Sequence, residues 1–126
     1  MKTSDDFDPE DIDIEGWVET GDFGRKVQKL EYPIEVSIED SSGRRTDRIT
    51  HIEYRRPVGR DLDRLEKMEG SNQVFSATRE FVHPLIFGDD RVTLSKLGEL
   101  DAADSLRSAA IAFSFFPQPR RKTSAK

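Results

Sequence analysis

The sequence predicts an α+β fold in which an N-terminal β-hairpin packs on a small C-terminal bundle of three to four helices. Between residues 30 and 38, apolar side chains fall on every second position, which is the period of a half-buried strand. After Pro57, apolar side chains recur at intervals of three and four, which is the period of an amphipathic helix. An isolated hairpin is barely stable in water, so the helices are expected to cover its apolar face.

The predicted hairpin has strands at residues 30–38 and at about residues 46–55, with Pro57 after the second strand. Pro33 has no backbone N–H, so the first strand should lie at a sheet edge or begin pairing after the proline. The polar residues 39–45 include one glycine and indicate a hairpin loop. The side chains expected on the apolar face are Leu30, Tyr32, Ile34, Val36, Ile38, Ile52 and Tyr54.

Three helical segments are expected after the hairpin. Residues 61–68 place apolar side chains on one stripe of a helix. Ser71 is a candidate N-cap for a second helix over residues 74–82, which should end or kink at Pro84. Residues 94–100 indicate a short helical turn.

The last predicted helix begins at Asp101, a good N-cap, and runs to about Phe116, with Pro117 as its stop. Asp104 stands three residues after the cap and suggests a capping box with aspartate in place of glutamate. The second half of this helix, residues 109–116, is apolar nearly all round. Such a helix is either fully buried or divides its faces between the core and a partner, and both alternatives stay open.

Charge divides the 126 residues into three parts, although the net charge is only −5. Residues 1–22 hold nine of the 25 acidic residues and one lysine, so we expect residues 1–25 to form an acidic, mostly disordered leader. Residues 26–116 should form a single domain, which is an ordinary size for one core. Residues 117–126 carry four basic residues and no acid, and we expect a flexible basic tail there.

Composition excludes several classes of protein and site. There is no cysteine, which excludes a disulfide scaffold, a thiolate zinc site and a cysteine nucleophile. The first residues contain no apolar stretch typical of a signal peptide, and no run reaches the roughly 18 apolar residues of a membrane span. We therefore expect a cytoplasmic protein with no membrane partner.

Residues 11–22 echo the calcium loop of an EF-hand, with acids at loop positions one, three, five and twelve and glycine at position six. However, Asp22 is shorter than the usual bidentate glutamate, Pro9 stands where the entering helix should be, and no clear exiting helix follows. A chance pattern in an acidic segment is the favoured interpretation, and calcium binding remains the alternative.

No other pattern indicates catalysis or a cofactor. His51 and His83 are the only histidines, and neither has a neighbouring nucleophile and orienting group in the sequence. The single glycines do not form a phosphate-binding loop. Arginines around the hairpin alternate with acids, which favours a salt-bridged surface over a nucleic-acid interface. We therefore predict no catalytic, cofactor-binding or metal-binding residues, and a protein that is not an enzyme.

The order of these elements resembles the small tail assembly chaperones of Mu-like and related phages and prophages. The resemblance covers about residues 26–116. The segments that carry it are the strand 30–38, Ile52-Glu53-Tyr54-Arg55-Arg56-Pro57, Gly59-Arg60-Asp61-Leu62, the run from Leu94 to Asp104, and Ile111-Ala112-Phe113.

The resemblance implies a chaperone that binds the tail tape measure protein, keeps it soluble and assists assembly of the tail tube, with the tail tube protein and further copies of the chain as possible partners. It also implies action in the host cytoplasm and absence from the mature virion. A tape measure protein is long and helical, so we expect an apolar face of this chain to receive a helix. The residues that we expect to supply this face are Phe75, Phe81, Ile111, Phe113, Phe115 and Phe116. The alternative is an acidic decoy or inhibitor that acts on a basic partner through its N-terminal leader.

Overall fold

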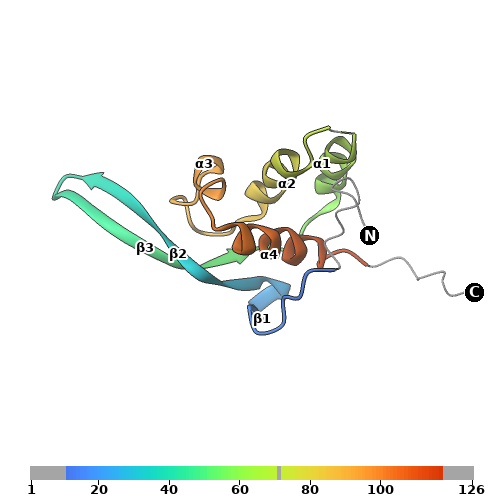
Figure 1. The fold of residues 1–126 in the computed structure, drawn as a ribbon, viewed down its shortest axis with the longest axis horizontal. Coiled ribbons are helices and arrows are strands. Elements are labelled where there is room, and N and C mark those ends of the chain that lie inside the picture. The colour runs from blue at the N-terminus through green and yellow to red at the C-terminus, as the bar shows by residue number, and fades with distance from the viewer. Residues whose placement is uncertain (1–10, 71, 118–126) are drawn as a thin grey trace, which may run out of the picture.

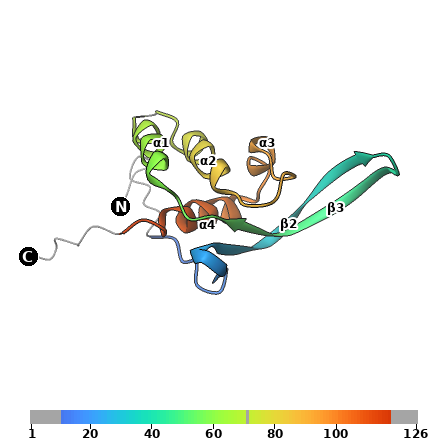
Figure 2. The ribbon, with the colours of Figure 1, turned by 180° about the vertical axis from the view of Figure 1, so that it is seen from behind.

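The computed structural model describes residues 11–70 and 72–117. The predicted N-cap Ser71, most of the basic tail and the first ten residues lie outside this described part. The described chain forms a three-stranded antiparallel sheet followed by helices, so the predicted α+β class is confirmed. Figure 1 and Figure 2 show the sheet on one side, α4 against it, and α1, α2 and α3 on the far side of α4.

The sheet contains strands β1 (Val18–Thr20), β2 (Lys26–Asp40) and β3 (Gly43–Tyr54), in that order. The expectation of a mostly disordered leader is wrong for residues 11–25. Within them, β1 pairs with the start of β2, and Trp17 O accepts a hydrogen bond from Lys29 N at 2.8 Å. The Arg107 guanidinium lies 4.2 Å from the centre of the Trp17 ring, a cation–π contact that fixes this segment on the last helix.

A short 3-10 helix, η3 (Asp22–Gly24), joins β1 to β2. Gly24 has φ of 75°, and a Cβ there would lie 2.6 Å from Cδ of Arg56. The backbone conformation therefore favours glycine at this turn, and a larger residue would also displace the Arg56 side chain.

Strands β2 and β3 form a hairpin that is longer than expected, with a two-residue turn between Asp40 and Gly43. Gly43 has φ of 119°, a conformation that suits glycine. The distal half of the hairpin extends away from the helices as an arm (Figure 1, Figure 2).

The pairing of the hairpin is interrupted in the middle of β2. Lys29 pairs with His51, but Ile34 is the next paired residue and lies opposite Ile49. The residues between them bulge out, because Pro33 lacks a donor and cannot continue the ladder. The bulge also turns Tyr32 outward to 53% exposure, so the expectation that it belongs to the apolar face is wrong.

The helices are α1 (Gly59–Glu69), α2 (Val74–Val82), α3 (Leu94–Leu97) and α4 (Ala102–Phe113), with a 3-10 turn η4 (His83–Leu85) after α2. Each of the three main helices begins within two residues of its predicted start. Helix α4 contacts β2 on one side and α2 on the other, which makes it the middle layer of the molecule. The described part of the chain contains no helix with the length and apolarity needed to cross a bilayer.

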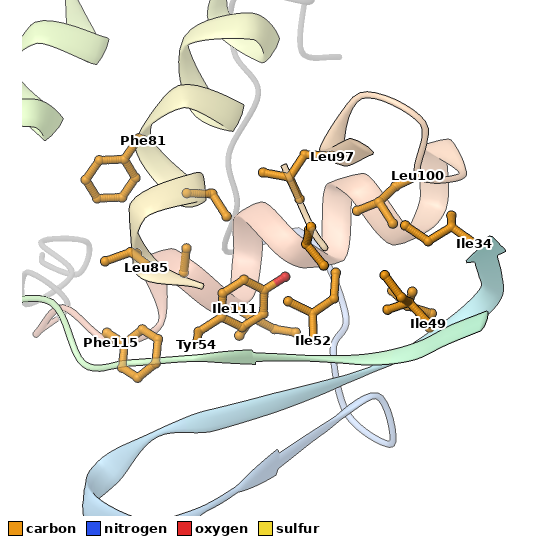
Figure 3. Close-up of a cluster of buried hydrophobic side chains, with 14 of the residues drawn as sticks. Ile34, Ile49, Ile52, Tyr54, Phe81, Leu85, Leu97, Leu100, Ile111 and Phe115 are labelled. Carbon is orange, nitrogen blue, oxygen red and sulfur yellow. The ribbon is translucent and has the colours of Figure 1, made fainter. Parts of the chain in front are cut away.

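The hydrophobic core fills the space between β3, the inner half of the hairpin and the helices (Figure 3). Tyr54 and Leu85 have no exposed surface, and Ile111 reaches them from α4. Burial strongly raises the pKa of Tyr54, so its hydroxyl stays protonated and donates to Gln28 Oε1 at 2.7 Å. The core thus contains a hydrogen-bonded polar pair, Tyr54 and Gln28, as well as apolar side chains.

Candidate interaction surface

A groove of about 370 Å³ lies between α1 and α2. Met68, Ala77 and Phe81 form its apolar part. Charged groups of both signs, including Arg64 and Glu80, stand around it. The residues that line the groove are Arg64, Lys67, Met68, Gln73, Ser76, Ala77, Glu80 and Phe81.

Asp61 in the first turn of α1 sets the position of the two helices that form this groove. Its side chain is 1% exposed and accepts hydrogen bonds from Val58 N at 2.6 Å, from Arg55 and from Arg64. Burial alone would raise the pKa of Asp61, but the hydrogen bonds from these arginines and from Val58 N outweigh it and hold the pKa well below its usual value. The carboxylate therefore stays ionised in the folded protein.

Arg64 links Asp61 on α1 to the end of α2. Its guanidinium donates to Phe81 O at 2.8 Å and lies 5.0 Å from the centre of the Phe81 ring. Backbone carbonyls at the end of a helix lack intrahelical partners, so an arginine there stabilises the end of α2. One side chain thus fixes the spacing of both walls of the groove.

Asp104 positions α4 against the sheet in a different way from the predicted capping box. Asp101 caps α4 by accepting from Ala103 N at 3.0 Å. Asp104 instead turns to the bulge of β2 and accepts from Glu31 N and Tyr32 N, each at 2.9 Å. The capping-box prediction is wrong, because these bulge N–H groups need a partner once they leave the ladder.

Three of the six predicted partner-binding residues meet beside the groove. Phe81 and Phe113 stack with ring centroids 5.6 Å apart, and Phe116 lies 6.1 Å from Phe81. Phe113 and Phe116 are partly exposed, whereas Phe81 is 2% exposed. Phe81, Phe113 and Phe116 thus form an aromatic cluster that packs beside the groove, on the side of Phe81.

The other three predicted residues lie elsewhere. Ile111 and Phe115 are buried in the core, with 0% and 5% exposure, so they offer no surface to a partner in this conformation. They are buried because α4 lies between the sheet and α2. Of the two alternatives for the apolar half of this helix, burial in the core therefore applies to these residues. Phe75 is 48% exposed but opens on a shallow cleft between α2, α3 and α4, where Leu106 is its neighbour in the lining.

The sequence predicted the aromatic cluster but not the groove itself. The missing residues include Lys67 and Ala77, which line the groove from α1 and α2. A signal exists in the small residues Ser76 and Ala77, which leave space beside a helix. Such space becomes a groove only when a second helix crosses it, and a sequence pattern does not show that crossing.

The residues that resemble a calcium loop are used for folding. Asp13 accepts a hydrogen bond from Glu15 N at 3.0 Å, and the second half of the pattern enters β1. Within residues 11–70 and 72–117, no group of three or more histidine, aspartate or glutamate side chains is arranged to hold a metal ion. His51 is exposed, and its ring Nδ1 lies 2.9 Å from the hydroxyl of Thr50.

Comparisons of the chain with protein-family models, with curated proteins and with solved structures found no match. The functional inference therefore depends on the residues of the chain itself.

Proposed function

We propose that the chain is a phage or prophage tail assembly chaperone that binds a helix of the tape measure protein in the α1/α2 groove. In this role it would keep the tape measure protein soluble in the host cytoplasm and would be absent from the mature virion. The groove is the observation that carries the proposal, because it joins an apolar base to a charged rim. The tape measure protein is the partner that the sequence resemblance implies.

The geometry favours a helical ligand over a small molecule. The groove is open along two helices, and recognition of an amphipathic helix by such a groove needs apolar anchors in the centre and polar contacts at the edge. Met68 and Ala77 supply the accessible apolar part, and Phe81, which is 2% exposed, forms the floor of the groove. Lys67 and Glu80 provide charges of opposite sign at the rim, so a helix with mixed charges can be held in a defined orientation.

The test is co-expression of the full chain with the tape measure protein encoded in the same phage genome. The variant Ala77→Arg fills the groove with a charged side chain. We expect it to lower the amount of soluble tape measure protein that co-purifies by about tenfold or more, because a guanidinium would be desolvated at the contact. Circular dichroism would check that the variant keeps its helical content.

The matched control is Ser95→Arg, which adds the same charge on α3 at an exposed position outside the groove. We expect co-purification with this variant to equal that of the wild type. Equal co-purification with both arginine variants would show that the groove is not the binding site. Failure of the wild-type chain to retain the tape measure protein would overturn the proposed function.

A further inference from the structure

The two long edges of the hairpin differ in how far they are protected. On β2, residues 26–28 pair with β1, and Asp104 caps the N–H groups of Glu31 and Tyr32. Pro33 has no N–H, and Lys96 Nζ donates to Glu35 O at 2.9 Å. Bulges, proline and charged side chains are the means by which proteins prevent strand addition at an edge.

The outer edge of β3 carries charged side chains but has no capping contact of this kind in the described part of the chain. Within the described residues, it makes backbone hydrogen bonds at its end only, where Phe87 N donates to Glu53 O and Arg55 N donates to Leu85 O, each at 2.8 Å. Residues 44–50 follow without a proline or a bulge of their own. The first part of this segment projects with the arm, away from the helices (Figure 2), whereas Asp47 pairs with Arg91 and Ile49 is buried in the core. A row of unpaired backbone groups of this kind is a template for another strand.

The open edge is also the basic side of the arm. Residues 44–50 hold three arginines and one aspartate, whereas residues 31–40 of β2 hold four acids and no base. Arg44 and Arg48 alternate with threonines on the exposed face of β3. The Arg44 side chain contacts Glu39 at 3.0 Å, and both side chains of this pair are 71% exposed. Arg48 lies opposite Glu35 in the ladder, and its side chain makes no ion pair or hydrogen bond with the described residues.

We propose that residues 44–50 of β3 bind an extended segment of another protein by β-strand addition, and that the segment carries acidic residues four positions apart. An added strand places residues i and i+4 on one face, with the same spacing as Arg44 and Arg48. The backbone ladder would supply affinity, and the two acids would fix the register. This interaction is independent of the α1/α2 groove.

A second copy of the chain fits the open edge poorly. A symmetric β3–β3 pair centred on Thr46 would set Arg44 directly opposite Arg48, and like charges in that position destabilise a sheet. The acidic strand of a second copy is β2, on which β1, Asp104 and Lys96 occupy the edge between residues 26 and 35, so that only residues 36–40 are open, a shorter stretch than residues 44–50. Charge complementarity therefore selects a separate acidic strand.

The probe is a blocked, fluorescent peptide with the sequence Thr-Val-Glu-Val-Thr-Val-Glu-Val-Thr, added to the full chain. We expect saturable binding by fluorescence anisotropy, together with slower amide exchange at residues 44–50. Replacing both glutamates by lysine should weaken binding by about tenfold or more. Two further peptides carry N-methyl groups on alternate backbone nitrogens, one at the odd positions and one at the even positions. Only the peptide whose methylated nitrogens face β3 should lose binding, because it loses the N–H donors of the ladder.

The variant Arg48→Glu should weaken binding of the glutamate peptide by about tenfold and restore binding of the lysine peptide. Lys29→Glu is the matched control, because Lys29 is exposed on β2 and the charge change is the same. If both N-methylated peptides bound equally well, backbone hydrogen bonds would not contribute and the interaction would be purely electrostatic. That result would overturn strand addition. No binding of the parent peptide would overturn it as well. If the chain formed concentration-dependent dimers in which amide exchange at residues 44–50 slowed without peptide, the edge would bind a second copy instead.

Discussion

Asp104 accepts two backbone N–H groups from a part of β2 that has left the ladder, and it has no exposed surface. Its backbone carbonyl also receives the Gln28 side chain at 3.0 Å. Arg107 completes the site, with its guanidinium 3.3 Å from Asp104 Oδ1 and 2.9 Å from Glu31 Oε1. One carboxylate thus satisfies the bulge and fixes α4 to the sheet.

Replacing Asp104 by alanine should lower the free energy of unfolding by about 3 kcal/mol, because the N–H groups of Glu31 and Tyr32 lose their acceptor and Arg107 loses one of its two acidic partners. Urea unfolding followed by circular dichroism measures this loss. Asp101→Ala is the control, since it removes a helix cap of the same residue type and should cost about 1 kcal/mol. Amide exchange at Glu31 and Tyr32 should accelerate in the Asp104 variant only. Equal losses in the two variants would contradict the role of Asp104 in the bulge.

Asp61 connects three secondary-structure elements. It binds Arg55 after β3 and Arg64 on α1, and Arg64 in turn binds the end of α2. The pKa of Asp61 is lowered in the folded state relative to its usual value. A depressed carboxyl pKa contributes stability that is fully present above the unfolded pKa of about 4 and is lost as the pH falls through that value toward the lower folded pKa. The wild type should therefore lose this contribution on acidification below about pH 4.

The variant Asp61→Asn should be less stable than the wild type by about 2 kcal/mol at neutral pH, because two arginines and Val58 N lose a charged acceptor. The difference should shrink as the pH falls below about 4, since Asp61 then becomes protonated in the unfolded wild-type chain, which favours unfolding. Thermal unfolding across this pH range measures both effects. A constant difference between the two proteins at every pH would show that Asp61 is not the titrating group.

The main secondary-structure elements could be predicted from periodicity because strands and helices depend on local pattern. Strand β1 was missed, since three residues in an acidic segment carry almost no pattern. Its pairing depends on β2, and its anchor Trp17 depends on the distant Arg107. The bulge was missed for the same reason, because its partner Asp104 lies more than 70 positions along the chain. The α1/α2 groove depends on how two helices cross, which no single segment encodes.

For the whole molecule, the layer order decides which residues can meet a partner. Helix α4 lies between the sheet and α2 (Figure 1), so residues 109–112 and Phe115 are buried, whereas Phe113 and Phe116 stay partly exposed. The distal hairpin arm extends from one end of the molecule, and α1 and α2, which form the groove, lie toward the other end (Figure 1). An aspartate at Phe115 would enter the core and unfold the protein, so it would not report on binding.

Ile111 at the centre of α4 tests this layer order directly. Ile111→Ala should lower the free energy of unfolding by about 3 kcal/mol, because the side chain is fully buried and its removal leaves a cavity between two layers. Leu62→Ala is the matched control, since it removes the same number of carbons from a residue that is 52% exposed on α1, and it should cost less than about 1 kcal/mol. Denaturant unfolding of both variants gives the comparison. If the two losses were equal, α4 would not be the middle layer, and its apolar face would again be available to a partner.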